Sequence, residues 1–473
     1  MITEETRSKI ESRYGALLTR NGKRHRINPQ GMAALYGEIS NCVYSPTESA
    51  FCLYDPESGL WKAQGREEML CRLGLFLHEC AKIWNIPEIE EQRTPSVLSG
   101  ILKFLIGIRS IPDFFKQSAE LFIHCANGVL ELAETGDWVL KPFSPMYRSR
   151  NRCEIHYSPG ACCPRFLNEL LHPLLQDDDM ELIQQYVGQC LTGRNITQSI
   201  LMLTGSGGSG KGTLANIVEL LIGEGNYTQI RPEQITSRFE SSFFRHKTLL
   251  TGKESNRSFF TAQGMQVLKS LVGDDKLRAE LKNSNQHEMI TGVYNIFIVG
   301  NTVPVLELES KDEASAWRRR LRWVKCKNAK PAKPIPSFDQ KLIAEEGPGI
   351  LNWALEGAKK VVQSGSSSLL SGPSQQTRLD YLFHASQPLD FFLATTVEKR
   401  PGTTITGDDL FRAFMEFAVA MEWPVWSQRE FQKKIPDAML RHFGSPLRRD
   451  VPRRRADGKT TNRSGYFHVA FKH

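Results

Sequence analysis

The 473-residue sequence lacks the segments that direct proteins into or across membranes. Its first residues are acidic and include no apolar stretch of the kind found in a secretory signal. The most apolar run, residues 101–108, is interrupted by Lys103 and is much shorter than the ~18 residues of a membrane helix. We therefore expect a cytoplasmic protein without a membrane partner.

Cysteine is scarce and scattered, with ten residues far apart along the chain. This usage excludes a disulfide-stapled scaffold and fits reduced thiols. One cluster contains Cys153, His156, Cys162 and Cys163, but it lacks the paired CxxC of structural zinc sites. Buried thiols are the favoured interpretation, and a metal site is the alternative.

Acidic residues are scarce at one end of the chain. Lys and Arg number 60 against 52 Asp and Glu, and residues 431–473 alone hold 11 Lys and Arg against 3 Asp. The remaining chain is neutral, so the whole excess of 8 lies in this segment. It predicts a polyanion-binding patch, with a solvated basic tail as the alternative.

Composition and periodicity divide the chain into four segments. Residues 1–193 mix short strands with helices and form an α+β N-terminal domain. Residues 194–365 alternate apolar strands with helices, which predicts an α/β domain with a mainly parallel sheet. The Ser/Gly-rich residues 366–386 are expected to be a flexible linker, and residues 387–473 a small separate domain.

A glycine-rich loop follows a predicted buried strand at residues 200–203. Gly205, Gly210 and Lys211 have the spacing GxxxxGK, in which backbone amides surround a β-phosphate and the lysine reaches the β and γ oxygens. An apolar helical stripe follows and ends at Gly223. We expect a site for ATP, with a flexible Gly/Ser turn as the alternative. The expected nucleotide-binding residues are Gly205, Gly207, Gly208, Ser209, Gly210, Lys211, Gly212 and Thr213.

One position departs from this motif. The motif has Ser or Thr directly after the lysine, whereas this chain has Gly212 and places Thr213 one residue later. A shift of one residue turns a side chain by about 100° around a helix. Thr213 is therefore a Mg²⁺ ligand only if the loop tolerates that rotation.

Two strand ends downstream supply further candidate catalytic groups. Residues 247–254 are β-prone and end in Glu254, a carboxylate suited to polarise the attacking water or to hold Mg²⁺. Lys253 stands where a second acid often precedes it. A second strand, residues 294–299, is followed by Asn301, whose amide can position water against a γ-phosphate. A surface glutamate and a turn asparagine are the alternatives.

A cluster of guanidinium groups completes the set. Arg318 and Arg319 follow Asn301 at a distance suited to an arginine finger that reaches the nucleotide of a neighbouring subunit. A surface basic cluster is the alternative. The order phosphate loop, Glu254, Asn301 and arginines favours a ring-forming ATPase over a small-molecule kinase.

The chain resembles the C-terminal helicase half of phage, plasmid and poxvirus primase-helicases, which are superfamily 3 helicases. The similar segments are residues 127–132, 157–161, 185–193, 268–275, 300–304, 316–320 and 349–357. The resemblance implies an AAA+-like homo-hexameric ring that binds ATP and Mg²⁺ between subunits and single-stranded DNA in its channel. It also implies that residues 1–193 are a pre-helicase or oligomerisation domain. The family's primase domain is not apparent, so a separate primase partner is plausible.

The resemblance also implies a DNA-contacting hairpin ahead of Asn301. The candidate channel contacts are Lys276, Arg278, Lys282 and His287. Such contacts to phosphates are independent of sequence and sensitive to salt. A solvated hairpin face is the alternative.

The basic end has the pattern of a winged helix-turn-helix. Thr406 begins one predicted helix, and Ser427 caps a second, from residue 428 to about residue 442, that Pro436 must kink or shorten. A basic hairpin follows. The candidate contacts to duplex DNA are Arg429, Lys433, Lys434, Arg448, Arg449, Arg453, Arg454 and Arg455. A basic module for subunit contact is the alternative.

These expectations converge on an ATP-dependent replicative DNA helicase of a mobile element or virus. The rival hypothesis is a replication initiator that binds an origin and uses ATP as an assembly switch. An adenylate-kinase-type phosphotransferase is disfavoured by the basic end and by Arg318 and Arg319.

Overall fold

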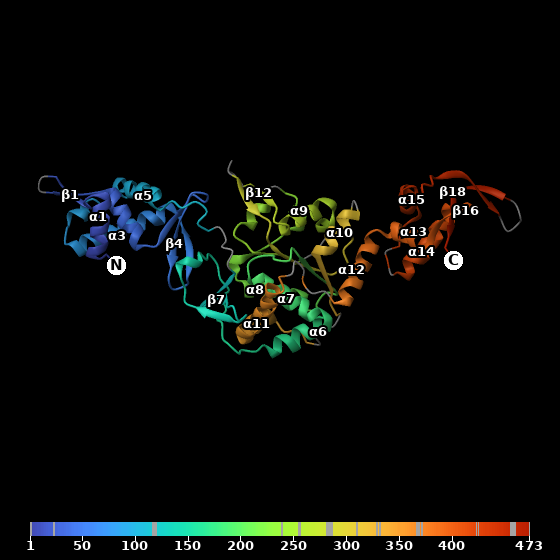
Figure 1. Cartoon of the computed structure of the whole chain (residues 1–473), viewed down its shortest axis with the longest axis horizontal. Helices are drawn as coiled ribbons and strands as arrows, with labels where there is room; N and C mark the ends of the chain where they lie inside the picture. The colour runs from blue at the N-terminus through green and yellow to red at the C-terminus, as the bar shows by residue number, and fades with distance from the viewer. Residues whose placement is uncertain are drawn as a thin grey trace.

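A computed structural model of the chain describes residues 2–21, 24–115, 121–237, 240–253, 257–280, 287–308, 311–327, 330, 333–365, 369, 372–421, 423, 425–454 and 460–472. The chain forms an elongated molecule with an N-terminal part, a large central part and a C-terminal part in a row (Figure 1). The two termini lie at opposite ends of this row.

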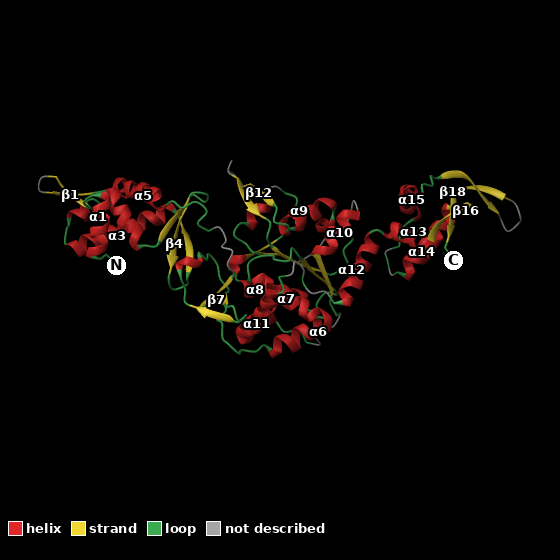
Figure 2. Cartoon of the chain, in the orientation of Figure 1, coloured by secondary structure: helices red, strands yellow, loops and turns green. Residues whose placement is uncertain are grey.

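The N-terminal part combines a helical core with small antiparallel sheets (Figure 2). Its helices are α1 (Glu4–Tyr14), α2 (Pro29–Ile39), α3 (Arg66–Trp84), α4 (Glu88–Glu91) and α5 (Pro95–Arg109). Its strands are β1 (Leu18–Asn21), β2 (Arg24–Ile27), β3 (Cys42–Ser45), β4 (Ala50–Asp55), β5 (Leu60–Gln64), β6 (Phe122–Cys125), β7 (Gly128–Leu132) and β8 (Trp138–Lys141). Strands β3-β4-β5 and β6-β7-β8 form two three-stranded sheets.

A parallel five-stranded sheet lies at the centre of the molecule, as the alternation of strands and helices predicts. Its order is β10-β11-β14-β9-β15. The strands are β9 (Ile200–Thr204), β10 (Tyr227–Gln229), β11 (Leu249–Gly252), β14 (Asn295–Gly300) and β15 (Leu321–Lys325). Strand β9 is buried along its whole length, which is expected for a parallel strand covered on both faces.

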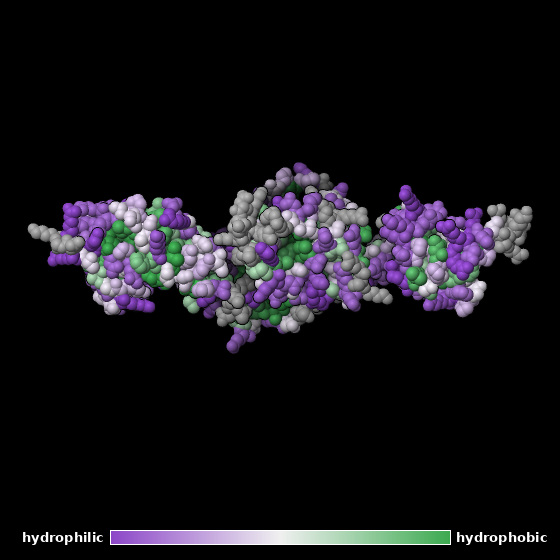
Figure 3. All heavy atoms as spheres, turned by 90° about the horizontal axis from the view of Figure 1, so that it is seen from above, coloured by the Kyte–Doolittle hydropathy of each residue, from purple (hydrophilic) through white to green (hydrophobic). Residues whose placement is uncertain are grey.

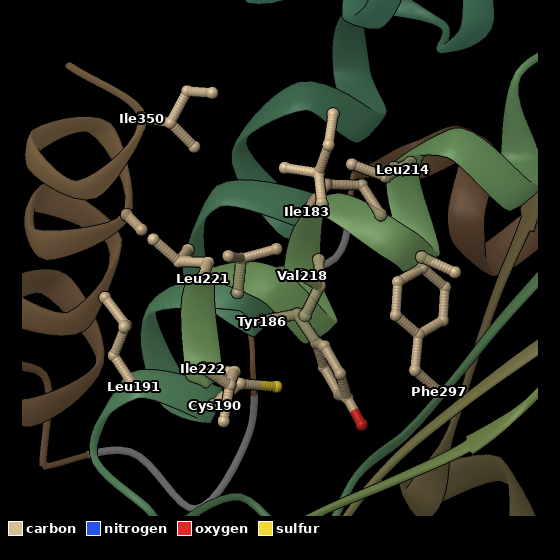
Figure 4. Close-up of a cluster of buried hydrophobic side chains, with 14 of the residues drawn as sticks. Ile183, Tyr186, Cys190, Leu191, Leu214, Val218, Leu221, Ile222, Phe297 and Ile350 are labelled. Atoms are coloured by element: carbon tan, nitrogen blue, oxygen red, sulfur yellow. The ribbon is translucent and has the colours of Figure 1, made fainter. Parts of the chain in front are cut away.

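Helices cover both faces of this sheet. One face packs against α7 (Met180–Leu191), α8 (Lys211–Ile222) and α11 (Phe338–Gln363) through Leu201, Leu203 and Phe297. Figure 4 shows Phe297 in one cluster with side chains of these helices, among them Tyr186, Val218 and Ile350. The other face packs against α9 (Ala262–Val272), α10 (Lys311–Arg320) and α12 (Pro373–Ser386) through Met202 and Ile298. The central part is therefore a three-layer α/β sandwich.

Part of the expected linker is a helix. Residues 373–386 form α12, and its apolar residues Leu379, Leu382 and Phe383 join the core beside β15. Arg378 of α12 also pairs with the buried Asp179 of η3 (Asp177–Asp179) and donates to Trp323 O at 3.3 Å. The linker expectation is wrong for this helix because its apolar spacing outweighs the Ser/Gly-rich composition before it.

The C-terminal part contains three helices and one antiparallel sheet. The elements are α13 (Pro388–Thr396), β16 (Val397–Thr406), α14 (Gly407–Ala420), α15 (Gln428–Phe443), β17 (Arg448–Arg454) and β18 (Thr460–Phe471), with strand order β16-β18-β17. Thr406 Oγ1 accepts from the Asp409 amide and Ser427 Oγ from the Glu430 amide, so both predicted helix starts are confirmed. Pro436 does not shorten α15, because burial of Phe431 and Met439 holds the turns on either side of it.

The structure also bears on metal and membrane binding. All ten cysteines are free, and the described residues include no group of three or more His, Cys, Asp or Glu that could hold a metal ion. In the cluster around Cys153, the thiols of Cys153 and Cys163 are buried as expected, whereas Cys162 is exposed. Among the described helices, none is both long and apolar enough to cross a membrane.

Candidate nucleotide site and nucleic-acid contacts

The glycine-rich loop joins the carboxyl end of β9 to the amino end of α8. Gly208 and Gly210 have φ of 80° and 99°, a backbone region that favours glycine. A Cβ built on Gly207, Gly208 or Gly212 would meet nothing within 4 Å, whereas one on Gly210 would lie 3.0 Å from Leu170 Cδ1. The loop therefore presents an open glycine surface beside the amino end of a helix, where anions are favoured.

Lys211 points back into this loop. Its Nζ donates to Gly205 O and Ser206 O, both at 2.8 Å, and to Ser209 Oγ at 3.3 Å. The residue is 3% exposed, and burial lowers the pKa of its ammonium. All three acceptors are neutral, so phosphate oxygens would be stronger partners for the same cation. The residues of this loop therefore fit the phosphate groups of a nucleoside triphosphate.

Asn301 lies beside the loop. Strand β14 pairs with β9 so that Gly300 stands level with Thr204, and the Gly205 amide donates to Gly300 O at 3.3 Å. Asn301 follows directly and is exposed. The structure therefore brings Asn301 next to the start of the glycine-rich loop.

Lys253 stands at the tip of β11 and is neutralised by a carboxylate that the sequence patterns did not indicate. Its Nζ lies 2.6 Å from Glu219 Oε2 and 2.7 Å from Asn216 Oδ1, both on α8. Thr251 Oγ1 donates to Glu219 Oε1 at 2.6 Å. Glu219 is the one acid in α8, on an otherwise apolar face, and that isolation is the signal that could have identified it. The tip of β11 is thus tied to the helix that follows the loop.

The described residues offer little to hold Mg²⁺. Thr213 lies in the first turn of α8 and is half-buried, while Gly212 and Lys253 occupy positions where a hydroxyl and an acid are usual. Glu254, the expected ligand and catalytic carboxylate, lies outside the described residues. Mg²⁺ usually keeps several waters and binds one or two carboxylates together with phosphates. The described residues therefore do not form a complete Mg²⁺ site.

Arg318 and Arg319 lie at the opposite edge of the sheet from the loop. Both are on α10, directly before β15, and β15 runs parallel to β9. Arg318 pairs with Asp380 and lies over the Phe383 ring at 4.6 Å, and Arg319 Nη2 donates to Gln198 Oε1 at 2.8 Å. A five-residue strand spans about 16 Å. The structure therefore separates these arginines from the loop of their own chain.

The segment before Asn301 includes an antiparallel hairpin of β12 (Lys276–Glu280) and β13 (His287–Thr291). Lys276 and Arg278 are both exposed and lie two residues apart on β12, so they share one face. His287 is on β13 opposite Glu280, and its side chain is outside the description. Lys282 also lies outside the described residues.

The predicted basic side chains of the C-terminal part are exposed where they are described: Arg429, Lys433 and Lys434 on α15, and Arg448 and Arg449 on β17. The surface of this part is mostly hydrophilic in the view of Figure 3. Arg453 and Arg454 lie on β17 without a described side chain, and Arg455 is outside the described residues.

Two of these basic side chains have partners. Lys434 Nζ is 4.4 Å from the centre of the Trp426 ring and 3.5 Å from Glu430 Oε1. Arg448 pairs with Asp450 at 2.6 Å. Positive charge is therefore partly compensated on both the helix and the hairpin.

The helix α15 faces the central part across a cavity of about 1130 Å³. Lys433, Lys434 and Arg441 line one side of it, and residues 302–305, which follow Asn301, line another. A ligand held by α15 would therefore lie beside the segment that follows Asn301.

Comparisons with known proteins identify one matching family and several similar solved structures. Residues 203–320 match a family described as a family of unknown function, DUF5906. No curated protein matches the chain.

The chain is similar to solved structures described as apo structures of the NrS-1 C-terminal region. One has 14% sequence identity and a TM-score of 0.48 over 93% of this chain and 99% of that chain, and another has the same values over 95% and 100%. These values support no inference about activity.

Proposed function

We propose that the chain is an ATP-dependent DNA helicase of a mobile element or virus that assembles as a ring and translocates on single-stranded DNA. Residues 194–365 together with α7 and α12 would form the ATPase, the residues before α7 an assembly domain, and residues 387–473 a winged-helix DNA-binding domain. The observation that carries the proposal is the division of candidate groups between the two edges of one parallel sheet.

Loops that follow parallel strands meet at one edge, and here they supply Lys211 and Asn301. Lys211 would bind the β and γ phosphate oxygens, and Asn301 would orient the attacking water. Arg318 and Arg319 precede a strand and lie at the other edge, so they can reach a nucleotide only in a neighbouring subunit. Mg²⁺, when bound with ATP, would neutralise charge on the phosphates, and Thr213 and Glu254 are its proposed ligands.

Two separate surfaces are proposed to bind DNA. Lys276, Arg278, Lys282 and His287 would contact single-stranded DNA from the hairpin. The topology of the C-terminal part, with two helices between β16 and the β17-β18 hairpin, supports a winged helix in which α15 enters a groove and the hairpin contacts phosphates.

The test is ATP hydrolysis with and without single-stranded DNA, together with strand separation on a forked duplex. We expect stimulation by DNA, and loss of hydrolysis in Lys211→Ala but not in the control Lys327→Ala, which removes a lysine outside the loop. Mixing Lys211→Ala with Arg319→Ala subunits should restore part of the activity, because an interface to which the Arg319→Ala subunit supplies the loop and the Lys211→Ala subunit the arginine has both groups intact. Absence of both stimulation and strand separation would refute the helicase.

The second candidate is an initiator that uses ATP only as an assembly switch. The ion pair of Lys253 with Glu219 favours it, because it places a cation where an acid usually supports hydrolysis. ATP-dependent ring assembly on duplex DNA without turnover would support this candidate.

A further inference from the structure

A basic cavity of about 780 Å³ lies between the N-terminal part and the central sheet. One wall consists of residues that precede strands of the sheet, including Arg194 before β9 and Lys247 before β11. The opposite wall consists of β6 and residues 146–153. The cavity therefore lies at the amino edge of the sheet, away from the glycine-rich loop.

Cations dominate the lining. Arg148, Arg150, Arg152, Arg194 and Lys247 line the cavity, and Asp113 is the one carboxylate among its lining residues in the described chain. Glu48 pairs with Arg150 at 2.9 Å and Glu154 with Arg152 at 2.9 Å, so part of the charge is compensated from outside the lining. Lys247 is half-buried, and burial lowers the pKa of its ammonium. An anionic ligand would relieve this cost.

Three of the cations follow one another at alternate positions. Residues 148, 150 and 152 lie on one irregular segment that begins at Arg148, whose φ of 51° is left-handed. Alternate residues of this segment therefore carry three guanidinium groups, a density of positive charge that favours a ligand with several phosphates.

Aromatic rings accompany the arginines. Arg148 lies over Phe114 at 4.8 Å and Arg150 over Phe115 at 3.7 Å, which fixes the planes of both guanidinium groups. Phe122 and Tyr147 also line the cavity, with ring centres 5.1 Å apart. Phe122 and Tyr147 are half-buried, and cations beside aromatic rings are the combination that binds phosphates and stacks bases.

The cavity also contains buried polar atoms without a partner among the described residues: His124 Nδ1, Ser149 Oγ and Arg150 Nε. His124 Nε2 lies 3.1 Å from Ser58 O and must donate to it, so Nδ1 is an acceptor. Burial lowers the pKa of His124 to about 4, which keeps its ring neutral. These three atoms have almost no exposed surface, so a ligand in the cavity would reach them only after the lining side chains move.

We propose that this cavity is a binding site for single-stranded nucleic acid, with the phosphates along Arg148, Arg150 and Arg152 and the bases against Phe122 and Tyr147. The site is separate from the hairpin and from α15. It does not depend on the proposed helicase function, because binding there needs neither ATP nor hydrolysis.

The test measures binding of a fluorescent oligothymidine of about 20 nucleotides to the full chain without nucleotide, by anisotropy. The double variant Arg148→Glu/Lys247→Glu should bind about tenfold or more weakly. Its slope of log affinity against log salt should fall by about 1.4, which is about 0.7 for each phosphate that the variant no longer neutralises. The control Lys9→Glu/Arg66→Glu makes the same charge change at exposed residues outside the cavity and should bind within about twofold of the wild type.

Three results would overturn the proposal. The first is unchanged binding in the cavity variant together with loss of binding in Lys276→Glu/Arg278→Glu, which would assign all binding to the hairpin. The second is displacement of the oligonucleotide by millimolar ATP from the Lys211→Ala protein, which would indicate a mononucleotide pocket. The third is photo-cross-linking of thiothymidine-substituted DNA only to residues that do not line the cavity. Should the double variant fail to fold, Arg148→Glu alone tests the same point, because Arg148 is exposed.

Discussion

Replacing Lys253 with methionine removes the cation that lies beside the buried carboxylate of Glu219. The Glu219 side chain is 5% exposed and that of Lys253 is 29% exposed, with 2.6 Å between Nζ and Oε2. The hydroxyl of Thr251 would still donate to the other carboxylate oxygen. The variant would therefore keep a buried charge with one neutral donor.

The expected cost follows from this geometry. Removing one partner of a fully buried ion pair costs about 3–5 kcal/mol. Because Lys253 is partly exposed and Thr251 remains, we expect about 2–3 kcal/mol for Lys253→Met. Glu219→Gln keeps a hydrogen-bonding side chain and should cost about 1 kcal/mol. The double variant loses both charges, so it should cost about 1–2 kcal/mol less than the sum of the single changes.

Native-state hydrogen exchange of the amides in α8 and β11 is the suitable assay, because a chain with several parts does not unfold in two states. The control is Lys360→Met, which breaks a half-exposed ion pair with Glu181 and should cost less than about 0.5 kcal/mol. If the single changes at Lys253 and Glu219 add to within about 0.3 kcal/mol, the two charges are not coupled and the reasoning fails.

Three further predictions test other parts of the chain. Lys211→Ala should weaken ATP binding about 100-fold in calorimetry at an unchanged unfolding temperature, because it removes a charged phosphate ligand; equal affinity would exclude the loop as the site. Gly188→Ala should destabilise the protein by about 3 kcal/mol in thermal unfolding, because its Cβ would lie 2.1 Å from the Ala358 backbone nitrogen and force α7 away from α11. A variant as stable as the wild type would contradict the close contact between α7 and α11 at Gly188. Burial raises the pKa of Asp179 from 3.8 to about 6, although the positive charge of Arg378 acts to lower it. This group therefore contributes about 3 kcal/mol of stability below about pH 4, and the contribution is lost as the pH rises through about 6. Asp179→Asn should lack this slope, and a wild type that gains stability over the variant between pH 4 and 6 would contradict the assignment.

Local signals in the sequence predicted the elements that position the candidate site. The loop between β9 and α8, the end of α8 at Gly223 and the capping residues Thr406 and Ser427 are all confirmed. These features depend on residues within a few positions of one another, so all the interacting residues can be recognised in a short stretch of sequence. The division of the chain into parts was less reliable, because the composition of residues 366–386 concealed the apolar spacing of α12.

Interactions between distant residues could not be predicted in the same way. Lys253 was identified as an unusual residue at the tip of β11, but its partner Glu219 lies 34 positions earlier on another element. The cavity at the amino edge depends on Arg148, Arg194 and Lys247, which only the fold brings together. A basic residue indicates a binding site only when its neighbours in space are known, and the sequence alone does not give those neighbours.

The opposed edges of the central sheet limit what one chain can do alone. Lys211 and Asn301 follow strands, whereas Arg318 and Arg319 precede one, and the strand between the two edges spans about 16 Å. A guanidinium side chain is too short to cross that distance around its own sheet. If Arg318 or Arg319 assists hydrolysis, it must act on the nucleotide of a second subunit, so the rate per chain should rise with protein concentration until assembly is complete. A rate independent of concentration in the dilute monomer would mean that Arg318 and Arg319 only secure α12 and Gln198, where the structure already pairs them.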